Sequence, residues 1–265
     1  MTNSAVFAQK DIRKIDFDNF TYSASCAFEE SKKITVKNSE FSESKEVDGY
    51  TDRFFFKVFG TSYGDLDGDN NDEAVILTVC NTGGTGNFTE GFIFGMKAGK
   101  PVLLTRIPGG DRAYGGLRKA RVEEGLLVVE SNDVGEAGGA CCPEFVVTNR
   151  YRVKAGKLTE VGKKERRELY PKERVKFPKG ASGTTFKTTI PAQELKRFIL
   201  GARAGQTLSV SIDSKSGSLR LIEDAEIKDE VTKITAKLPK NGDYTFEVQN
   251  FEEKDTEFII SVKIN

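Results

Sequence analysis

The sequence contains no histidine and no tryptophan among its 265 residues. Histidine is the commonest general base and a common zinc ligand, so its absence removes the usual means of activating a nucleophile and of holding zinc. An excess of charge is also missing, because 40 Lys and Arg residues balance 40 Asp and Glu residues. The overall charge therefore predicts neither a nucleic-acid partner nor a membrane partner.

Long hydrophobic runs are missing as well. No segment approaches the roughly 18 apolar residues that a membrane-spanning helix requires, so we expect no membrane span. The remaining composition, 37% hydrophobic and 30% charged with 19 Phe, is typical of a soluble globular protein. A chain of 265 residues has room for one large all-β domain or for two ordinary domains.

The first ten residues, 1–10, include small side chains that are typical of the end of a signal peptide. The run from Ser4 to Ala8, followed by Gln9, would place a cleavage point after Ala8. The charged and apolar regions that should precede such a point are missing from the sequence. We interpret 1–10 as the remnant of a signal peptide, which predicts a periplasmic or extracellular protein. The alternative is a polar N-terminus without regular structure.

The sequence has four cysteines, Cys26, Cys80, Cys141 and Cys142, and no Cys-x-x-Cys spacing. The missing spacing argues against a zinc or thioredoxin-like motif. Two disulfides, with three possible pairings, suit an exported protein. Because a bond between the adjacent Cys141 and Cys142 would strain the intervening peptide, we expect Cys26 to pair with one of them and Cys80 with the other. The alternative is four buried free thiols in a cytosolic protein.

The densest run of charge places five carboxylates in the nine residues that begin at Asp65. Carboxylates this close repel one another unless a cation or solvent offsets their charge. The alternation of Asp65, Asp67 and Asp69 directs short oxygen-bearing side chains toward a common centre, as a hard cation with six to eight oxygen ligands requires. Gly68 and Asn70 suit the tight backbone of such a loop, since both residue types accept a positive φ.

A cation site in this stretch would differ from an EF-hand. The twelfth position of an EF-hand loop is a bidentate Glu, whereas that position is Ile76 here. Glu73 could close the site instead, and we expect Asp72 to face solvent. We favour calcium over magnesium, because a flexible carboxylate-rich loop suits six to eight ligands better than a strict octahedron. The alternative is a solvated acidic turn before a strand.

Short apolar segments separated by turns predict an antiparallel β domain over 11–165. The run at 73–80 is almost continuously apolar, so we expect a central strand that is buried on both faces. Its partner is expected at 88–96, after a glycine-rich hairpin turn. Residues 12–22 alternate loosely and are expected to form a strand, whereas the polar residues 38–52 are expected to form a loop.

A glycine-rich loop at 109–116 could display Asp111, Arg112 and Tyr114 as a binding surface. We favour an ordinary crossover in which Asp111 pairs with Arg112. The earlier glycine-rich connection at 81–87 lacks the following Lys and Ser or Thr of a phosphate-binding loop, which leaves a hairpin turn as the better interpretation.

A basic stretch separates the two halves of the chain. Residues 150–180 contain 12 Lys or Arg against 4 Asp or Glu, together with Pro171 and Pro178. This composition predicts a solvated basic linker at 166–173. The stretch lacks the interleaved aromatic residues and the folded motif of a nucleic-acid-binding surface, so we expect no nucleic-acid partner.

The second half, 174–265, contains several short alternating segments at regular spacing, which predicts a C-terminal β-sandwich. The clearest example is 207–212, in which apolar and polar residues alternate strictly. Asn241-Gly242-Asp243 is a strong turn signal. Residues 194–200 are expected to form a helical turn or an irregular strand.

The acidic stretch resembles the calcium loops of FG-GAP and VCBS repeats, which read Asp-x-Asp/Asn-Gly-Asp-Gly-x-x-Asp before a strand. Here Asn70 replaces the usual Gly and Glu73 the usual Asp, and the motif does not recur, which excludes a whole propeller. The wider stretch 63–151 looks like a family of uncharacterised secreted bacterial proteins. The resemblance implies Ca2+ as the bound ion and five ligands, which are Asp65, Asp67, Asp69, Glu73 and the carbonyl of Asn71.

Residues 174–265 resemble bacterial pre-peptidase C-terminal domains. The resemblance rests on Ala204–Val210 (AGQTLSV), Leu238–Tyr244 (LPKNGDY) and the closing Ile259–Val262 (IISV). It implies a β-sandwich accessory domain of an exported protein. Inhibitors of g-type lysozyme share this pattern, although the segment after Ile212, where their inhibitory loop would lie, is short here.

These features together predict a mainly β, two-domain, exported bacterial protein with one calcium site and no catalytic centre. We expect a binding or accessory module at the cell envelope, whose partner is an unknown protein or an envelope glycan. The alternative is an inhibitor or adhesin that acts through the C-terminal sandwich. A hydrolase based on carboxylate pairs is a third class, but no second carboxylate cluster is placed to face the first.

Overall fold

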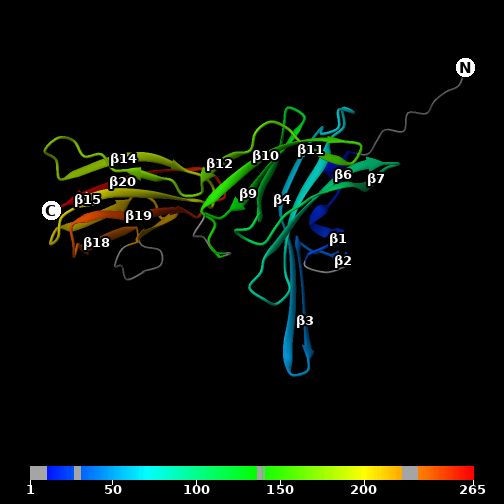
Figure 1. The fold of residues 1–265 in the computed structure, drawn as a ribbon, viewed down its shortest axis with the longest axis horizontal. Helices are drawn as coiled ribbons and strands as arrows, with labels where there is room; N and C mark the ends of the chain where they lie inside the picture. Colours follow the sequence, from blue (N-terminus) through cyan, green and yellow to red (C-terminus); the bar gives the residue numbers. More distant parts are fainter. Residues whose placement is uncertain (1–10, 27–30, 136–138, 140, 223–231) are drawn as a thin grey trace, which may run out of the picture. The chain divides into compact units, whose positions relative to one another are not determined.

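A computed structural model describes residues 11–26, 31–135, 139, 141–222 and 232–265. The expected signal remnant at 1–10 lies outside these residues. Within them the chain is built almost entirely of strands, which confirms the predicted mainly β fold (Figure 1). The chain divides into two compact units, Met1–Leu169 and Tyr170–Asn265.

The N-terminal unit has a five-stranded antiparallel sheet in the order β3-β4-β5-β6-β7, a two-stranded sheet β1-β2, and a third sheet in the order β11-β10-β9-β8 with β12 also paired to β10. The strands are β1 (Thr21–Ala24), β2 (Lys32–Thr35), β3 (Glu40–Val47), β4 (Tyr50–Gly64), β5 (Glu73–Asn81), β6 (Phe88–Lys97), β7 (Lys100–Ile107), β8 (Leu117–Glu123), β9 (Leu126–Asp133), β10 (Phe145–Lys154), β11 (Lys157–Glu160) and β12 (Glu165–Glu168).

Strand β5 is the middle strand of the five-stranded sheet, and both of its faces are buried. Ala74 and Ile76 pack with the aromatic side chains of β1, β4 and β6 in one core. Val75 and Leu77, which alternate with them, pack against the β8, β9 and β10 sheet in a second core. The continuous apolar run therefore reflects burial on two faces, and the prediction of a central strand is confirmed.

The segment before β1 does not form the strand expected at 12–22. It contains two short 3-10 helices, η1 (Ile12–Lys14) and η2 (Phe17–Asn19), and only Thr21–Ala24 is a strand. The side chain of Asp16 accepts hydrogen bonds from the backbone at the start of η2, a local bond that competes with strand pairing. The apolar side chains of this segment still pack into the first core.

The prediction of a loop at 38–52 is also wrong, because this segment contains strand β3. Strands β3 and β4 pair from Glu40↔Lys57 to Val47↔Tyr50 and form a hairpin that extends away from the body of the unit (Figure 1). Tyr50, near the tip of this hairpin, is 81% exposed. The distal part of the hairpin is solvated on both faces, so its sequence carries no apolar alternation that would reveal a strand.

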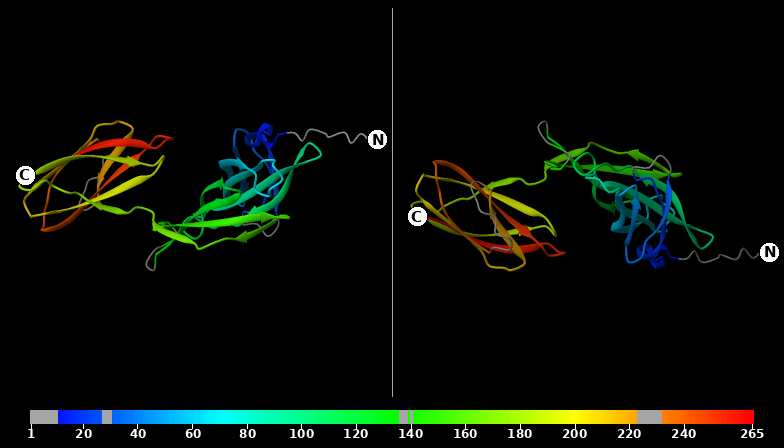
Figure 2. Two further views of the ribbon diagram at one scale, coloured as in Figure 1. Left: turned by 90° about the horizontal axis from the view of Figure 1, so that it is seen from above. Right: turned by 90° about the horizontal axis from the view of Figure 1, so that it is seen from below.

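The C-terminal unit is a sandwich of two four-stranded sheets around one core (Figures 1 and 2). The sheet orders are β13-β15-β19-β17 and β14-β20-β16-β18, and the β13-β15 pair is parallel. The strands are β13 (Lys172–Arg174), β14 (Gly183–Ile190), β15 (Leu195–Ala202), β16 (Thr207–Ile212), β17 (Gly217–Leu221), β18 (Lys233–Lys237), β19 (Gly242–Asn250) and β20 (Thr256–Ile264).

Two expectations for the second half need correction. The irregular segment expected at 194–200 is the regular strand β15, which pairs along its whole length with β19. The basic linker expected at 166–173 is largely strand, because β12 pairs with β10 and β13 pairs with β15. Ion pairs of Arg166 with Asp133 and of Arg167 with Glu130 offset part of the positive charge of the stretch.

Limited trypsin digestion tests whether the two units fold separately. The exposed Lys163 and Lys164 lie between β11 and β12, outside any strand. We expect the first cuts between Lys163 and Arg174, leaving two resistant fragments that mass spectrometry can identify. First cuts within 11–160 or 183–264 would contradict the division.

Candidate functional site

The acidic loop connects β4 to β5, between Gly64 and Glu73. Gly64 packs so tightly that a Cβ added to it would lie 2.7 Å from side-chain carbons of Val122 on β8. Leu66 is 2% exposed and packs into the core between the two sheets. Gly64 and Leu66 therefore anchor the first part of the loop to the core. The carboxylate pattern did not reveal this role of Leu66.

The backbone of the loop is held by its own carboxylates. Asp65 accepts hydrogen bonds from the N–H groups of Gly68 at 2.7 Å and Asn70 at 3.0 Å. Asp67 accepts one from the N–H of Asp69 at 3.2 Å. Gly68 and Asn70 both have positive φ, at 85° and 64°, as the sequence predicts for a tight loop.

Three of the predicted ligands converge. Oxygen atoms of Asp65, Asp67 and Glu73 all lie within 4.8 Å of one another, a spacing that one metal ion could bridge. Asp69 lies outside this group, and its carboxylate accepts a hydrogen bond from the N–H of Asn71 at 2.7 Å. The expected role of the Asn71 carbonyl as a ligand stays a prediction.

Glu73 is the unusual member of the group, because the residue is only 3% exposed. Its carboxylate accepts one hydrogen bond, from the N–H of Leu66 at 2.8 Å. Burial raises the pKa of Glu73 to about 7, and the nearby carboxylates of Asp67, Asp69 and Asp65 add to the rise. Burial and the neighbouring Asp69 also raise the pKa of Asp67. The ionised carboxylates of this loop are therefore disfavoured in the folded chain. The same holds for the carboxylates of a cation site when no cation offsets their charge.

Asp72 does not face solvent freely, contrary to expectation. Its carboxylate is 2.6 Å from the guanidinium of Arg13, which also lies 5.0 Å from the centre of the Tyr63 ring. Arg13 belongs to η1 and is 59 residues away in sequence, so no local pattern predicts this pair. The ion pair turns Asp72 toward the N-terminal segment and removes it from the set of available ligands.

The disulfides differ from the expected cross-pairing. Cys26 bonds to Cys80, and Cys141 bonds to Cys142. Cys26 follows β1 and Cys80 lies on β5, so this bond fastens the two-stranded sheet to the main sheet. The predicted cross-pairing was wrong because it excluded a bond between the adjacent Cys141 and Cys142. In addition, β1 packs against β5 and β6, which brings Cys26 close to Cys80.

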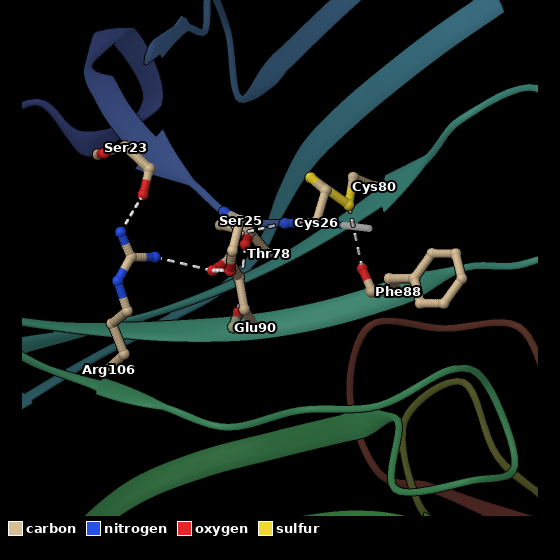
Figure 3. A network of polar contacts seen from close by, with 8 residues as sticks. All are labelled: Ser23, Ser25, Cys26, Thr78, Cys80, Phe88, Glu90 and Arg106. Atoms are coloured by element: carbon tan, nitrogen blue, oxygen red, sulfur yellow. Dashed lines mark hydrogen bonds and ion pairs between the residues drawn. A yellow bond between two sulfur atoms is a disulfide. The ribbon is translucent and has the colours of Figure 1, made fainter. Parts of the chain in front are cut away.

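A buried polar cluster lies beside the first disulfide (Figure 3). Glu90 on β6 accepts hydrogen bonds from the N–H and the hydroxyl of Ser25 at 2.8 and 2.7 Å, and from Arg106 on β7 at 2.8 Å. Arg106 also donates to the carbonyl of Ser23. Glu90 is 7% exposed, and this cluster compensates its burial, so we interpret it as structural rather than catalytic.

The glycine loop at 109–116 is a tight crossover, as predicted, and Tyr114 within it is 54% exposed. Asp111 pairs with Arg112 at 3.1 Å, as predicted, and also accepts a hydrogen bond from the N–H of Asn87 at 2.7 Å. A Cβ added at Gly110 would lie 1.8 Å from the carbonyl oxygen of Tyr114, so the close approach of these two backbone segments requires glycine.

No protein family and no curated protein matches the sequence. Among solved structures, the chain is similar to a periplasmic inhibitor of g-type lysozyme from Aeromonas hydrophila, with 20% identity and a TM-score of 0.30. The corresponding inhibitor from Salmonella Typhimurium is 22% identical to the chain, also with a TM-score of 0.30. The matches cover 36% of this chain and 96% and 97% of the inhibitors, respectively.

A β-fructofuranosidase from Schwanniomyces occidentalis matches 89% of this chain and 73% of its own, with 9% identity and a TM-score of 0.24. Likeness at these levels gives no basis for transferring a function. No helix in the described part of the chain is long and apolar enough to cross a membrane.

Proposed function

We propose that the protein is a non-catalytic binding module of the bacterial cell envelope whose N-terminal unit carries one calcium ion. The observation that carries the proposal is the convergence of Asp65, Asp67 and the buried Glu73. Three carboxylates at this spacing, one of them withdrawn from water, are strongly unfavourable together unless a cation offsets them.

Calcium is the cation that suits this group. Carboxylate oxygens are its preferred ligands, and the exposed side of the loop leaves room for water to complete six to eight ligands. Asp65 and Asp67 use only part of their oxygen capacity on backbone N–H groups, since a carboxylate has about four lone-pair sites. The Cys26–Cys80 disulfide supports an oxidising compartment, where millimolar calcium is available to weak sites.

The proposal predicts a graded response to changes in the loop. At about ten times a dissociation constant near 10⁻³ M, calcium should stabilise the fold by RT ln 11, roughly 1.4 kcal/mol. Thermal unfolding of the wild-type chain should therefore shift upward in millimolar calcium and downward in chelator. Asp67→Asn should weaken the shift and Asp67→Ala should abolish it.

Asp72→Ala is the matched control for this series. It removes a carboxylate from the same loop, but one that pairs with Arg13. We expect its calcium response to stay close to that of the wild type. If Asp72→Ala loses the response and Asp67→Ala keeps it, the ligand assignment is wrong.

A second candidate function is inhibition of a g-type lysozyme by the C-terminal sandwich. It rests on the sequence motifs of that unit, which fold together: the N–H of Ala204 donates to the side chain of Asn241 at 2.8 Å, and the Tyr244 hydroxyl donates to the carbonyl of Lys240 at 2.7 Å. A stoichiometric excess of the full chain should slow lysis of cell walls by a g-type lysozyme. Unchanged lysis would remove this candidate for that enzyme class.

A further inference from the structure

The outer edge of strand β3 is a free edge of the five-stranded sheet. Strand β3 comes first in the order of this sheet, and no described strand pairs with its outer edge. The strand has 8 residues and no proline, and its register with β4 has no shift. Its hairpin extends away from the body of the unit (Figure 1). A long, regular edge strand of this kind offers unpaired backbone N–H and C=O groups to another strand.

The hydrogen bonds at the start of β3 show which backbone groups point outward. The N–H and C=O of Glu40 bond to Lys37 at 3.2 and 2.9 Å, so they are directed away from β4. The C=O of the preceding Ser39 accepts a bond from the N–H of Val58 on β4 at 2.8 Å. Because this direction alternates along an antiparallel strand, every second residue after Glu40 also presents its backbone groups outward.

The outward residues that remain free are Ser42, Ser44 and Glu46, and the set is centred on Ser44. All three are exposed, and no described hydrogen bond engages their outward backbone groups. A second copy, antiparallel about a two-fold axis at Ser44, would pair Ser42 with Glu46 of that copy and Ser44 with its counterpart. Three such pairs with two bonds each supply six backbone hydrogen bonds and use the whole free edge.

The charged side chains of β3 select the same register. Glu43 and Lys45 share one face of the strand, lie 2.7 Å apart, and have side chains that are 44% and 63% exposed. With the axis at Ser44, Glu43 of each copy lies opposite Lys45 of the other. An axis one residue earlier or later would place Glu43 opposite Glu43, or Lys45 opposite Lys45, and like charges directly opposite each other are destabilising. Charge complementarity therefore favours a second copy in this register.

We propose that two copies of this chain associate through the outer edges of β3, in an antiparallel pairing centred on Ser44. The two five-stranded sheets would then join into one continuous sheet. The same edge is used on both copies, so the assembly closes as a dimer. An interface of one strand from each copy is small, and we therefore expect weak, concentration-dependent association.

This pairing goes beyond the proposed function and does not use the acidic loop. The paired edge precedes β4, whereas the acidic loop follows the end of β4 at Gly64. Self-association should therefore be the same in calcium and in chelator. The two proposals can fail separately, since a chain that stays monomeric can still bind calcium, and a chain that binds no calcium can still form the dimer.

Sedimentation velocity of the full chain, from about 10 µM to about 1 mM, tests the proposal in the range of a weak interface. We expect a monomer that converts to a dimer as the concentration rises. Hydrogen exchange measured over the same range locates the interface. Exchange at the outward amide of Ser44 should slow as the dimer forms, whereas exchange at the amide of Glu43, which is directed toward β4, should change little.

Charge reversal on β3 tests the register. Glu43→Lys and Lys45→Glu each place like charges opposite each other twice in the dimer, and each should weaken self-association about tenfold. An equimolar mixture of the two variants should associate like the wild type, because every charge pair across the axis is again of opposite sign. Ser44→Pro removes an outward N–H without breaking a bond to β4, and should abolish association in this range.

Lys187→Glu is the matched control for Lys45→Glu. Lys187 lies on β14 in the C-terminal unit, its side chain is also 63% exposed, and it pairs with Glu257 at 2.7 Å. This variant should associate like the wild type. Equal weakening by Lys187→Glu and Lys45→Glu would show a general effect of charge and would overturn the assigned interface.

The proposal is also overturned if the wild-type chain stays monomeric over the whole range, since the free edge would then not pair with a second copy. A mixture of Glu43→Lys and Lys45→Glu that associates no better than either variant alone would contradict the register. Association that persists in Ser44→Pro, or that leaves exchange at the Ser44 amide unchanged, would place the contact elsewhere in the chain.

Discussion

Replacing Glu73 by Gln is expected to stabilise the chelator-treated protein at pH 8 by up to about 3 kcal/mol and to remove its response to calcium. Glutamine keeps an oxygen that can accept the hydrogen bond from Leu66 but carries no charge into the buried position. The size of the effect follows from a rise in pKa from 4.5 to about 7, at 1.36 kcal/mol per unit.

The same shift fixes the direction of the pH dependence. Because the pKa of Glu73 is higher in the folded than in the unfolded chain, the folded state holds the extra proton between about pH 4.5 and 7. The contribution of Glu73 to stability is therefore lost as the pH rises through this window and is flat above it. Saturating calcium should offset the loss, so the stabilisation by calcium should grow with pH.

Urea unfolding at pH 5 and pH 8, in calcium and in chelator, measures both effects. Glu253→Gln, an exposed substitution in the C-terminal unit, is the control and should follow the wild type at both pH values. If Glu73→Gln and Glu253→Gln behave alike in chelator, Glu73 is not a buried ionised group. If Glu73→Gln retains the wild-type calcium response, Glu73 is not a ligand.

The second large effect is expected from the Cys26–Cys80 disulfide. Replacing both residues by Ser should destabilise the N-terminal unit by about 4 kcal/mol, because the bond spans 54 residues and closes a long loop in the unfolded chain. The loss should also loosen Ser25, whose N–H and hydroxyl donate to the buried Glu90. Chemical unfolding monitored by circular dichroism measures the change.

The double replacement of Cys141 and Cys142 by Ser is the matched control for this comparison. Their bond joins adjacent residues and therefore closes almost no loop, so its loss should cost far less. Mass spectrometry of peptides from unreduced protein should recover the Cys26–Cys80 link. Equal destabilisation by the two replacements would contradict the structural role assigned to the long-range bond.

The parts of the fold that the sequence predicted share a strong local signal. The run Ala74–Leu77 is apolar without interruption because both faces of β5 are covered, and this pattern identified the central strand before the structure did. The strict alternation in Thr207–Ile212 matches a strand with one buried face. In both cases the pattern of apolar residues in the sequence follows the burial of the side chains in the strand.

The parts that the sequence did not predict depend on contacts between distant residues or on weak patterns. Strand β3 is polar because its hairpin is solvated, so only its pairing with β4 shows that it is a strand. The ion pair between Arg13 and Asp72 joins residues 59 positions apart. The acidic loop itself was recognisable from its spacing, but only the structure shows which three carboxylates converge and that one of them is buried.

Equilibrium dialysis against calcium, followed by measurement of the bound ion, tests the central claim most directly. The wild-type chain is predicted to retain one calcium per chain at millimolar concentrations, with a dissociation constant of about 10⁻⁴ to 10⁻³ M, and Asp67→Ala is predicted to retain none. Magnesium at the same concentration should not displace the ion. A wild-type chain that holds no more calcium than the dialysis buffer, or an Asp67→Ala chain that still holds one, would contradict the account.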